Sequence, residues 1–246
     1  NPVDTVSLRF CVSAGERLPA NIYHEWKRLT GLDIVDHIGA TEMLQMAVSN
    51  RPDRIKPGSA GRPIPGCEVR ILDETGAEIV GPGLGELAAR SGSAFAGYFN
   101  DPERTAVTLK DGWVFTRDMV RRDVDGDYWF QGRADDLFKV KGQWVSPVEV
   151  EEALLTCDEV HEVAVVAGTD ETGLGSTVAF VVPSPGNAPG RELAELLTGL
   201  ISSRLPPYKR PSEFRFVDSL PRTATGKIQR FKLREPPGPF VQRSGG

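Results

Sequence analysis

Turn-forming residues are spread unevenly along this chain of 246 residues, and their distribution constrains its fold more than any other feature. In residues 1–57, strand-like and helix-like segments alternate. Residues 58–132 hold short strand-like runs separated by Pro and Gly, whereas residues 133–246 return to longer helix and strand patterns. We therefore expect a multidomain α/β and α+β chain: the end of an α/β sheet subdomain, a small β-barrel-like subdomain and a mobile C-terminal α+β domain.

The first part has the order strand, helix, strand. An apolar run from Val6 to Val12 predicts a buried strand, and the helix after it is expected to begin at Pro19 and to stop at Gly31. Asp33 to Asp36 indicates a short second strand. This order favours a parallel sheet, but the segment is too short for a complete doubly wound domain, so we expect the chain to begin inside a larger α/β subdomain.

The second part is expected to form a small β-barrel or folded sheet. One helix interrupts its strands, with Asp101 as N-cap and Pro102 as first residue. The dipeptide Asp125-Gly126 fits a two-residue hairpin turn, because both positions tolerate positive φ. The expected strands include Cys67 to Asp73, Gly85 to Ser91 and Tyr128 to Gln131.

The third part carries the pattern of a compact α+β module. The capping-box spacing from Ser146 to Glu149 predicts a helix that runs to about Thr156. Arg191 to Leu205 has leucines at helical spacing and predicts a second helix. Between these helices, strands are expected at Glu162 to Ala167 and at Thr177 to Val182.

Composition excludes several classes of partner. The 29 Lys and Arg residues against 34 Asp and Glu residues give a net charge of -5 without a basic stretch, so nucleic acid is not expected as a partner. The longest apolar run is too short to span a bilayer, and no membrane association is expected. Cys11, Cys67 and Cys157 lack the spacing of metal ligands, which favours reduced thiols and a cytoplasmic protein.

Four segments concentrate small and charged residues outside any predicted core. The first, residues 37–42, follows a predicted strand end, where open α/β sheets bind ligands. The hydroxyl of Thr41 beside the carboxylate of Glu42 could hold the magnesium ion of a nucleotide, because Mg²⁺ prefers carboxylates together with phosphate oxygens. A capped turn is the simpler interpretation of this segment taken alone.

The second segment contains Asp118, and Arg133 stands at the end of the next predicted hairpin. A carboxylate and a guanidinium on neighbouring strands could bind a ribose diol, and a surface salt bridge is the simpler alternative. The third segment, residues 134–144, spans the change of pattern between two modules. Its adjacent acids, Asp135 and Asp136, indicate either a solvated linker or a hinge.

The fourth segment, Leu220 to Arg230, presents Gly226-Lys227 on a threonine-rich loop. It lacks the first glycine of a Walker phosphate-binding loop and the hydroxyl residue after its lysine. Lys227 would therefore act alone. A solvated loop lysine is the simpler interpretation of this segment by itself.

Taken together, the four segments occur in the order and approximate spacing typical of the adenylate-forming superfamily of acyl-CoA synthetases, peptide-synthetase adenylation domains and luciferases. The chain resembles this family over nearly its whole length, including Gly85-Glu86-Leu87, Gly97 to Thr105 and Leu205 to Pro211. Within the superfamily, three segments are most similar to benzoate-type CoA ligases: Ala40 to Leu44, Lys141 to Pro147 and Thr223 to Arg234.

The resemblance implies an ATP-dependent carboxylate–CoA ligase that acts on an aromatic acid such as benzoate or a substituted benzoate. The acid and ATP give an acyl-adenylate and pyrophosphate, and CoA then displaces AMP. ATP, Mg²⁺ and CoA are thus the expected cofactors and substrates, and a homodimer is compatible with the family. The phosphate loop of such an enzyme is expected upstream of Asn1, so this chain alone is expected to be inactive.

The resemblance also assigns roles to residues. Lys227 is the expected catalytic residue of adenylation, Thr41 and Glu42 are expected to hold phosphate and Mg²⁺, and Asp118 and Arg133 to bind ribose. The adenine site is assigned to Ala14, Gly15, Glu16, Asp36, His37, Ile38 and Gly39. The other assignments are the hinge at Asp135, the acyl pocket at Gln45, and a CoA site formed by Gly142, Gln143, Trp144, Tyr208 and Arg210.

Three residues depart from the family pattern. Ile38 takes the place of an aromatic ring against adenine. Arg117 replaces the usual glycine before the ribose aspartate, so this turn must either avoid positive φ or bear strain. Gln45 stands where a benzoate-type enzyme is expected to have histidine, which favours a substituted ring or another ring acid.

Two other functions fit the same resemblance. One is an aryl-acid adenylating enzyme that loads the phosphopantetheine of a carrier protein. The other is a non-catalytic fragment that retains the fold without the chemistry. The second is disfavoured because a drifted site should have lost at least one of the residues Glu42, Asp118, Arg133, Asp135 and Lys227.

Overall fold

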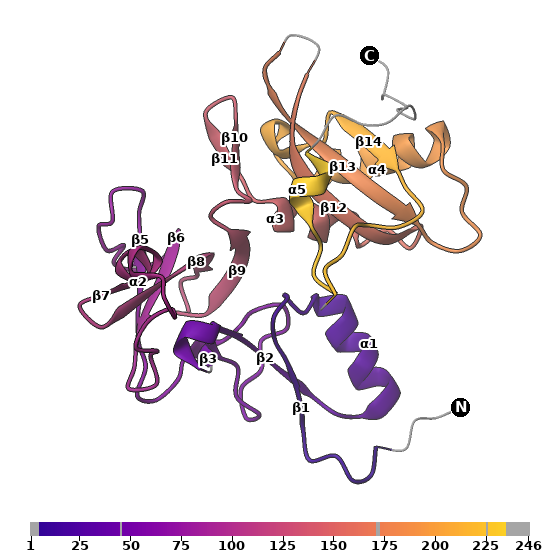
Figure 1. Cartoon of the computed structure of the whole chain (residues 1–246). Helices are drawn as coiled ribbons and strands as arrows, with labels where there is room; N and C mark the ends of the chain where they lie inside the picture. The colour runs from indigo at the N-terminus through magenta and orange to yellow at the C-terminus, as the bar shows by residue number, and fades with distance from the viewer. Residues whose placement is uncertain (1–4, 45, 171–172, 225, 235–246) are drawn as a thin grey trace. The chain divides into compact units, whose positions relative to one another are not determined.

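The computed structural model describes residues 5–44, 46–170, 173–224 and 226–234. The chain divides into two compact units, Asn1–Ala134 and Asp135–Gly246 (Figure 1). The division falls beside the expected hinge, and rotation there stays a prediction. Within the described residues, no helix has the length and apolar character needed to cross a membrane.

A four-stranded sheet opens the first unit. β1 (Cys11–Ser13) and β2 (Ile34–Gly39) are parallel, and α1 (Ala20–Thr30) connects them. β3 (Met46–Ser49) and β4 (Arg62–Pro63) extend the sheet in the antiparallel sense. The parallel strand–helix–strand unit confirms the sequence prediction. Because β4 belongs to this sheet, the boundary predicted at residue 57 lies inside a single compact unit.

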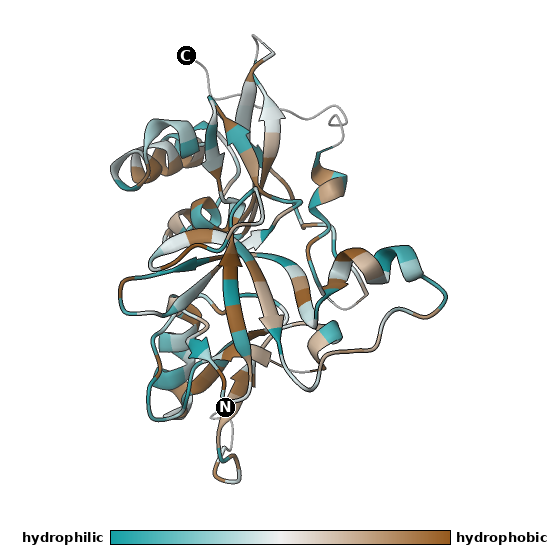
Figure 2. Cartoon of the chain, turned by 90° about the vertical axis from the view of Figure 1, so that its left-hand side faces the viewer, coloured by the Kyte–Doolittle hydropathy of each residue, from teal (hydrophilic) through white to brown (hydrophobic). Residues whose placement is uncertain are grey.

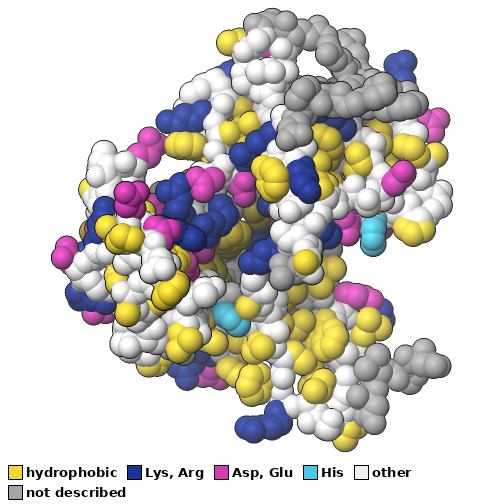
Figure 3. Space-filling model, in the orientation of Figure 1, with side chains coloured by type: hydrophobic (Ala, Val, Ile, Leu, Met, Phe, Trp, Pro, Cys, Tyr) yellow, Lys and Arg dark blue, Asp and Glu magenta, His cyan; other side chains and the backbone are white. Residues whose placement is uncertain are grey.

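Two predicted strand boundaries are wrong. The strand predicted from Val6 is reduced to β1. Among the residues that the structure describes, β1 pairs only with β2, and the apolar residues before it are not covered by a sheet. β2 runs beyond Asp36, so residues 37–39 belong to a strand rather than to a loop. Hydrophobic side chains are visible on this part of the surface in Figure 3, and the exposed ones include Val6, Leu8, Phe10, Val12, Ile22 and Leu29.

The second sheet of this unit is curled and antiparallel. β6 (Gly83–Arg90) lies between β5 (Glu68–Leu72) and β8 (Trp113–Arg122), while β7 (Leu109–Lys110) and β9 (Tyr128–Arg133) also pair with β8. Hydrophobic and hydrophilic residues alternate along its strands (Figure 2), as expected for a sheet with one buried face. One core joins both sheets of the unit, and it includes Ile38, Met43, Val48, Ile71, Leu87, Val114, Val120 and Tyr128.

The end of one helix and the start of another in the first unit lie where their capping residues predict, whereas α1 begins at Ala20, one residue after the predicted Pro19. α1 ends at Gly31, whose φ of 73° lies in the left-handed region that favours glycine. α2 (Pro102–Thr108) begins after Asp101, whose carboxylate accepts a hydrogen bond from the backbone N–H of Arg104. Both signals are local, which is why the sequence alone located them.

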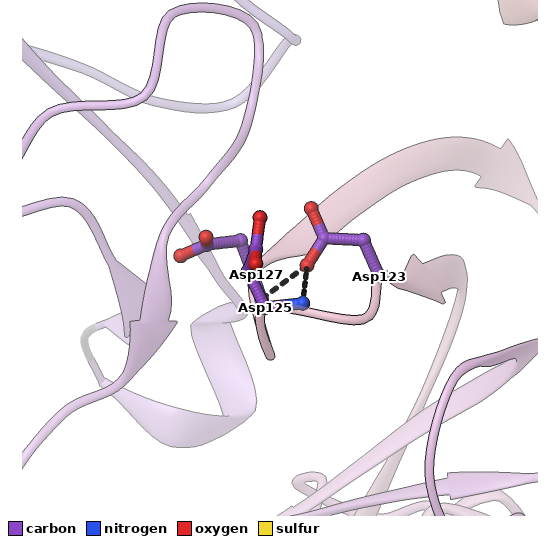
Figure 4. A group of neighbouring side chains, drawn as sticks. All are labelled: Asp123, Asp125 and Asp127. Carbon is purple, nitrogen blue, oxygen red and sulfur yellow. Dashed lines mark hydrogen bonds between the residues drawn. The ribbon is translucent and has the colours of Figure 1, made fainter.

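The hairpin between β8 and β9 is confirmed, but its turn differs from the predicted one. Gly126 has a φ of 83° and donates its N–H to the carbonyl of Asp123, which gives a three-residue loop closed by a left-handed glycine. The physical reason is the carboxylate of Asp123. Its Oδ1 accepts the backbone N–H groups of Asp125 at 3.0 Å and Asp127 at 2.9 Å (Figure 4).

The three aspartates of this turn bring carboxylate oxygens within 4.8 Å of one another, but cations already surround them. Lys56 Nζ lies 2.7 Å from Asp123, 3.0 Å from Asp125 and 3.4 Å from Asp127. Arg54 donates two hydrogen bonds to the completely buried carboxylate of Asp127 and lowers its pKa. The cluster is therefore an ion-pair network that ties residues 54–56 to the hairpin.

The second unit is built on a three-stranded sheet. β12 (Val160–Thr169) and β13 (Gly175–Pro183) are antiparallel, and β14 (Glu213–Phe216) joins β13 in the parallel sense. One core packs α3 (Pro147–Leu154) and α4 (Arg191–Arg204) against this sheet through Val150, Leu154, Leu193, Leu197, Ile201, Val163, Val165, Ala179, Val181 and Phe214. The intervening strand residues form a second core with Leu220 and Ile228.

The two helices and two strands predicted at stated residues of this unit are confirmed. Ser146 Oγ accepts the N–H of Glu149 at the start of α3. The structure adds a short helix at Arg230–Leu233 and a hairpin, β10 (Phe138–Val140) and β11 (Gln143–Val145), inside the segment expected to be a linker or a hinge. Its two-residue turn, Lys141 and Gly142, has φ values of 50° and 79°, which is the geometry that the sequence had suggested for residues 125–126.

Arg117 lies within β8 with a φ of 61°, so the strained alternative predicted for this position is the observed one. Its backbone N–H donates to Glu86 Oε1 at 3.0 Å, and glycine at this position can make the same bond. We expect Arg117→Gly to raise the free energy of unfolding by roughly 0.5–1 kcal/mol, because a left-handed conformation costs about 1–2 kcal/mol and the entropy of glycine in the unfolded chain offsets part of this. Urea unfolding followed by tryptophan fluorescence measures the change.

The matched control is Arg121→Gly, an exposed position on the same strand whose φ is not positive. In this variant the free energy of unfolding should fall by roughly 0.5–1 kcal/mol, because glycine is unfavourable inside a strand. If Arg117→Gly lowered the free energy of unfolding as much as Arg121→Gly does, the backbone of Arg117 would not be strained.

Asp127 gives a pH-dependent prediction. Its folded pKa is lowered, so its ion pairs stabilise the fold above the unfolded pKa of about 3.9 and are lost as the pH falls through the folded value. Asp127→Asn should therefore cost on the order of 2 kcal/mol at pH 7, after discounting for the partly exposed cations, and the gap from wild type should close below about pH 4. Asp125→Asn, on an exposed side chain of the same turn, should cost about 0.5 kcal/mol or less. If the difference in free energy of unfolding between wild type and Asp127→Asn stayed constant from pH 7 to pH 3, the ion pairs of Asp127 would not stabilise the fold.

Candidate functional site

The carboxylate expected to bind Mg²⁺ lies on a short turn after β2. η1 (Thr41–Met43) is a 3-10 turn in which Thr41 is exposed and Glu42 is half-buried. Phe95 donates its N–H to the carbonyl of Glu42 at 2.8 Å, and the hydroxyl of Tyr98 donates to the Glu42 carboxylate. The turn presents a hydroxyl and a carboxylate on adjacent residues, and these are the oxygen donors that suit Mg²⁺.

Buried polar atoms gather beside the parallel strands. Ser13, the last residue of β1, pairs with Asp36 of β2. The segment that starts at Ala14 therefore leaves the sheet beside Asp36. Asp36 is 6% exposed, and burial raises its pKa to about 7. One of its oxygens accepts the N–H of Leu18 at 3.4 Å, whereas Oδ1 has no hydrogen-bond partner among the described residues. Buried polar atoms are almost always paired, so this oxygen fits a site completed by a ligand.

The other residues assigned to adenine differ in exposure. His37 Nδ1 is buried without a partner among the described residues, and burial lowers the pKa of this imidazole. Ile38 packs into the core of the first unit, so its contact with adenine stays a prediction. The exposed positions are Ala14, Gly15, Glu16 and Gly39.

The pair expected to bind ribose is formed across the β8–β9 hairpin. Asp118 and Arg133 are register partners, and Arg133 Nη1 donates to Asp118 Oδ1 at 2.8 Å and to the carbonyl of Thr116 at 3.0 Å. The carboxylate side chain is 10% exposed and the guanidinium side chain 48% exposed. The salt bridge of the simpler interpretation is therefore present. It also holds the Asp118 carboxylate in one orientation, in which its oxygens could accept hydrogen bonds from hydroxyl groups.

Lys227 lies in a tight turn of the second unit. The N–H of Thr223 donates to the carbonyl of Lys227 at 2.8 Å, and the N–H of Lys227 donates to Thr223 Oγ1 at 3.0 Å. Gly226 has a φ of 91°, and the side chain of Lys227 is exposed. Thr225 and the acyl-pocket residue Gln45 lie outside the described residues.

The helix after this turn is anchored to the start of the second unit. In α5 (Arg230–Leu233), Arg230 donates to the buried carboxylate of Glu151 at 2.9 and 3.0 Å. Arg234 donates to Asp136 at 2.8 Å and to the carbonyl of Asp135 at 3.2 Å. The helix that follows the lysine turn is therefore bonded, through Arg234, to the backbone of the expected hinge residue.

Most of the residues assigned to CoA lie close together. Gly142, Gln143 and Trp144 are on the β10–β11 hairpin, and β11 lies beside η2 (Pro207–Lys209), which carries Tyr208. Lys139 Nζ lies 4.4 Å from the centroid of the Trp144 ring. Arg210 is different, because its guanidinium donates to the carbonyls of Ser202 and Leu205 at the end of α4.

Sequence reasoning assigned no role to Tyr98 or Glu86, although both lie in segments that carry the resemblance. Tyr98 bonds to Glu42, and Glu86 bonds to the backbone of Arg117, the residue before Asp118. Each contact joins positions far apart in the chain. Periodicity and capping patterns are local and hold no signal for such contacts.

Comparison with protein families matches residues 2–99 to the AMP-binding enzyme family and residues 149–227 to the AMP-binding enzyme C-terminal domain. A 3-hydroxybenzoate–CoA ligase of Aromatoleum sp. (strain CIB) is 44% identical over 93% of this chain and 44% of its own length. A benzoate–CoA ligase of Thauera aromatica is 46% identical over 92% of this chain and 43% of its own length.

Solved structures give the same result. An anthranilate CoA ligase, AuaEII, in complex with anthranoyl-AMP matches with a TM-score of 0.89 at 43% identity, over 94% of this chain and 45% of that chain. A benzoate CoA ligase from Burkholderia xenovorans LB400 matches with a TM-score of 0.87 at 44% identity, over 93% of this chain and 46% of that chain. The chain thus spans a little less than half the length of these relatives. It belongs to the AMP-binding, adenylate-forming enzyme family.

Proposed function

We propose that this chain is part of an AMP-forming ligase that joins an aromatic carboxylic acid to CoA. The observation that carries the proposal is the identity of 44–46% with ligases named for 3-hydroxybenzoate and benzoate, over more than nine-tenths of this chain. Because the chain spans less than half of these relatives, the activity belongs to a longer protein that contains it.

The proposed reaction has two steps. A carboxylate oxygen of the acid attacks the α-phosphorus of ATP, the bond from this phosphorus to the oxygen shared with the β-phosphate breaks, and pyrophosphate leaves. The sulfur of CoA then attacks the carbonyl carbon, the bond from this carbon to the phosphate oxygen breaks, and AMP leaves while the thiol proton passes to solvent. Each step develops negative charge, which fixed donors and cations stabilise.

The first unit supplies the nucleotide contacts in this proposal. Asp118 accepts hydrogen bonds from the ribose hydroxyls, and Arg133 keeps its carboxylate oriented. The buried oxygen of Asp36 is available to the exocyclic amino group of adenine. Thr41 and Glu42 hold the Mg²⁺ that accompanies the nucleotide, and this ion neutralises phosphate charge when bound.

The second unit supplies the moving parts. Lys227 bridges the carboxylate and the α-phosphate during adenylation, because a compact ammonium on a flexible stem can follow shifting oxygens. Rotation about Asp135 then removes Lys227 and brings Gly142, Gln143 and Trp144 towards the pantetheine arm of CoA. Hinges of this kind absorb backbone rotation at the end of an element, and Asp135 follows directly after β9 and Ala134.

The proposal is tested by acid-dependent exchange of pyrophosphate into ATP with the full-length protein. Benzoate, 3-hydroxybenzoate and 2-aminobenzoate should support exchange, whereas aliphatic acids should support it weakly. Free CoA should then accept the acyl group. Transfer only to a carrier-protein phosphopantetheine would favour the carrier-loading alternative, and exchange with aliphatic acids alone would overturn the aromatic assignment.

Removing the carboxylate of Asp118 should weaken ATP binding. A charge-assisted hydrogen bond contributes about 1.5–3 kcal/mol, so Asp118→Ala should raise the KM for ATP roughly ten- to hundredfold. Asp118→Asn keeps the shape and should give a smaller rise. Asp53→Ala, at an exposed carboxylate of the same unit, is the control. A wild-type KM in a folded Asp118→Ala enzyme would show that the ribose assignment is wrong.

Removing the ammonium of Lys227 should separate the two half-reactions. Lys227→Ala should slow acyl-adenylate formation by about a hundred- to thousandfold, the usual effect of losing one preorganised charge. Thioester formation from preformed acyl-adenylate should stay within a few-fold of wild type. Lys232→Ala removes an exposed lysine of the neighbouring helix and should affect neither step. Rapid-quench measurement of both steps decides, and parallel loss of both with an intact fold would refute the assignment.

A further inference from the structure

The backbone of the Glu42 turn is held by a segment about fifty residues later in the chain. Ser93 Oγ donates to the carbonyl of Met43 at 2.8 Å, and the N–H of Phe95 donates to the carbonyl of Glu42 at 2.8 Å. These two bonds fix the main chain of η1. They do not fix the carboxylate of Glu42, which lies at the end of a side chain with several rotatable bonds.

The carboxylate is held separately, by the hydroxyl of Tyr98. The ring of Tyr98 is itself fixed on two sides. Phe95 meets it edge-on, with ring centroids 4.9 Å apart, and the guanidinium carbon of Arg104 lies 4.0 Å from its centroid.

The main chain of Tyr98 is tied to α2. Its N–H donates to Thr105 Oγ1 at 2.9 Å, and the Thr105 hydroxyl donates to the carbonyl of Asp101, the N-cap of the helix. Gly97 precedes it with a φ of 145°, and a Cβ atom there would lie 2.8 Å from Thr105 Cγ2. Glycine is thus needed for the approach that places Tyr98 on the helix.

We propose that Tyr98 is a positioning residue, which holds the carboxylate of Glu42 in the orientation that binds the Mg²⁺ of the nucleotide. This inference rests on the proposed function, since it requires Glu42 to be a ligand of that ion. The Tyr98 hydroxyl donates to Oε1 of the Glu42 carboxylate. This bond restricts the orientation of the carboxylate, and with it the direction of the lone pairs that remain for the ion. Tyr98 acts through Glu42, and α2 with Arg104 acts through Tyr98. This gives a role to the Gly97-to-Thr105 segment, which the nucleotide site alone leaves without one.

The test is the Mg²⁺ dependence of full-length Tyr98→Phe, which loses the hydroxyl and keeps the ring. Equilibrium binding of a non-hydrolysable ATP analogue is measured by calorimetry over a range of Mg²⁺ concentrations, together with the rate of adenylation. The half-saturating Mg²⁺ concentration should rise roughly three- to tenfold in both measurements, which is less than the full effect of losing a hydrogen bond to a charged group, because Tyr98 acts on Mg²⁺ only through the orientation of Glu42. Thioester formation from preformed acyl-adenylate should be unchanged.

Tyr23→Phe is the matched control. The hydroxyl of the buried Tyr23 also donates to a carboxylate, that of Asp33, so this variant loses the same kind of bond in the same unit. Its Mg²⁺ requirement should remain that of wild type. Equal Mg²⁺ requirements in Tyr98→Phe and Tyr23→Phe would overturn the proposal, whatever the two variants do to thermal stability.

A double-mutant cycle separates this proposal from the proposed function. Glu42→Gln should weaken Mg²⁺-dependent binding by itself, and adding Tyr98→Phe should change it no further, because Tyr98 acts only through the carboxylate. An equal additional shift in the double variant would overturn the positioning role while leaving Glu42 as a ligand. Wild-type Mg²⁺ dependence in Glu42→Gln would instead remove the ligand assignment, and the positioning role with it.

Discussion

The register of the β8–β9 hairpin is the constraint on which the arrangement of the first unit depends. The carboxylate of Asp123 fixes the turn, and a bulge in β9 between Phe130 and Gly132 then shifts the pairing by one residue, so that Asp118 lies opposite Arg133. Because side chains alternate between the two faces of a strand, a slip of one residue would turn Asp118 away from Arg133. The cations at Asp127 tie the same hairpin to residues 54–56. The turn and the bulge together thus place both the ribose pair and the residue that precedes the second unit.

Some buried polar groups in this protein are fully paired, whereas others have no partner among the described residues. Fully paired groups hold elements together: Asp127 with its cations joins two segments of the first unit, and Glu151 with Arg230 anchors the helix after the lysine turn. Asp36 Oδ1 and His37 Nδ1 are buried without partners among the described residues, beside the parallel strands where a nucleotide is proposed. Desolvation without a partner costs stability, so such atoms fit a site that a ligand completes.

Local signals in the sequence predicted much of the fold. Gly31, Asp101 and Ser146 located helix ends because a cap acts on neighbouring backbone groups. Strand lengths were predicted less well, since β1 depends on how many strands lie beside it. The turn geometry expected at residues 125–126 is found at 141–142 instead, because the carboxylate of Asp123 selects another turn. Contacts such as Tyr98 with Glu42 join distant positions, and no local pattern encodes them.

The fate of the carboxylate oxygens tests the proposed chemistry most directly. The full-length enzyme is supplied with benzoate that carries ¹⁸O in both carboxylate positions, together with ATP and CoA, and the products are analysed by mass spectrometry. An acyl-adenylate pathway transfers one ¹⁸O per turnover to the phosphate of AMP, because the attacking oxygen stays on phosphorus when the thiol displaces AMP. Formation of ADP with the label in inorganic phosphate, or AMP without label, would contradict it.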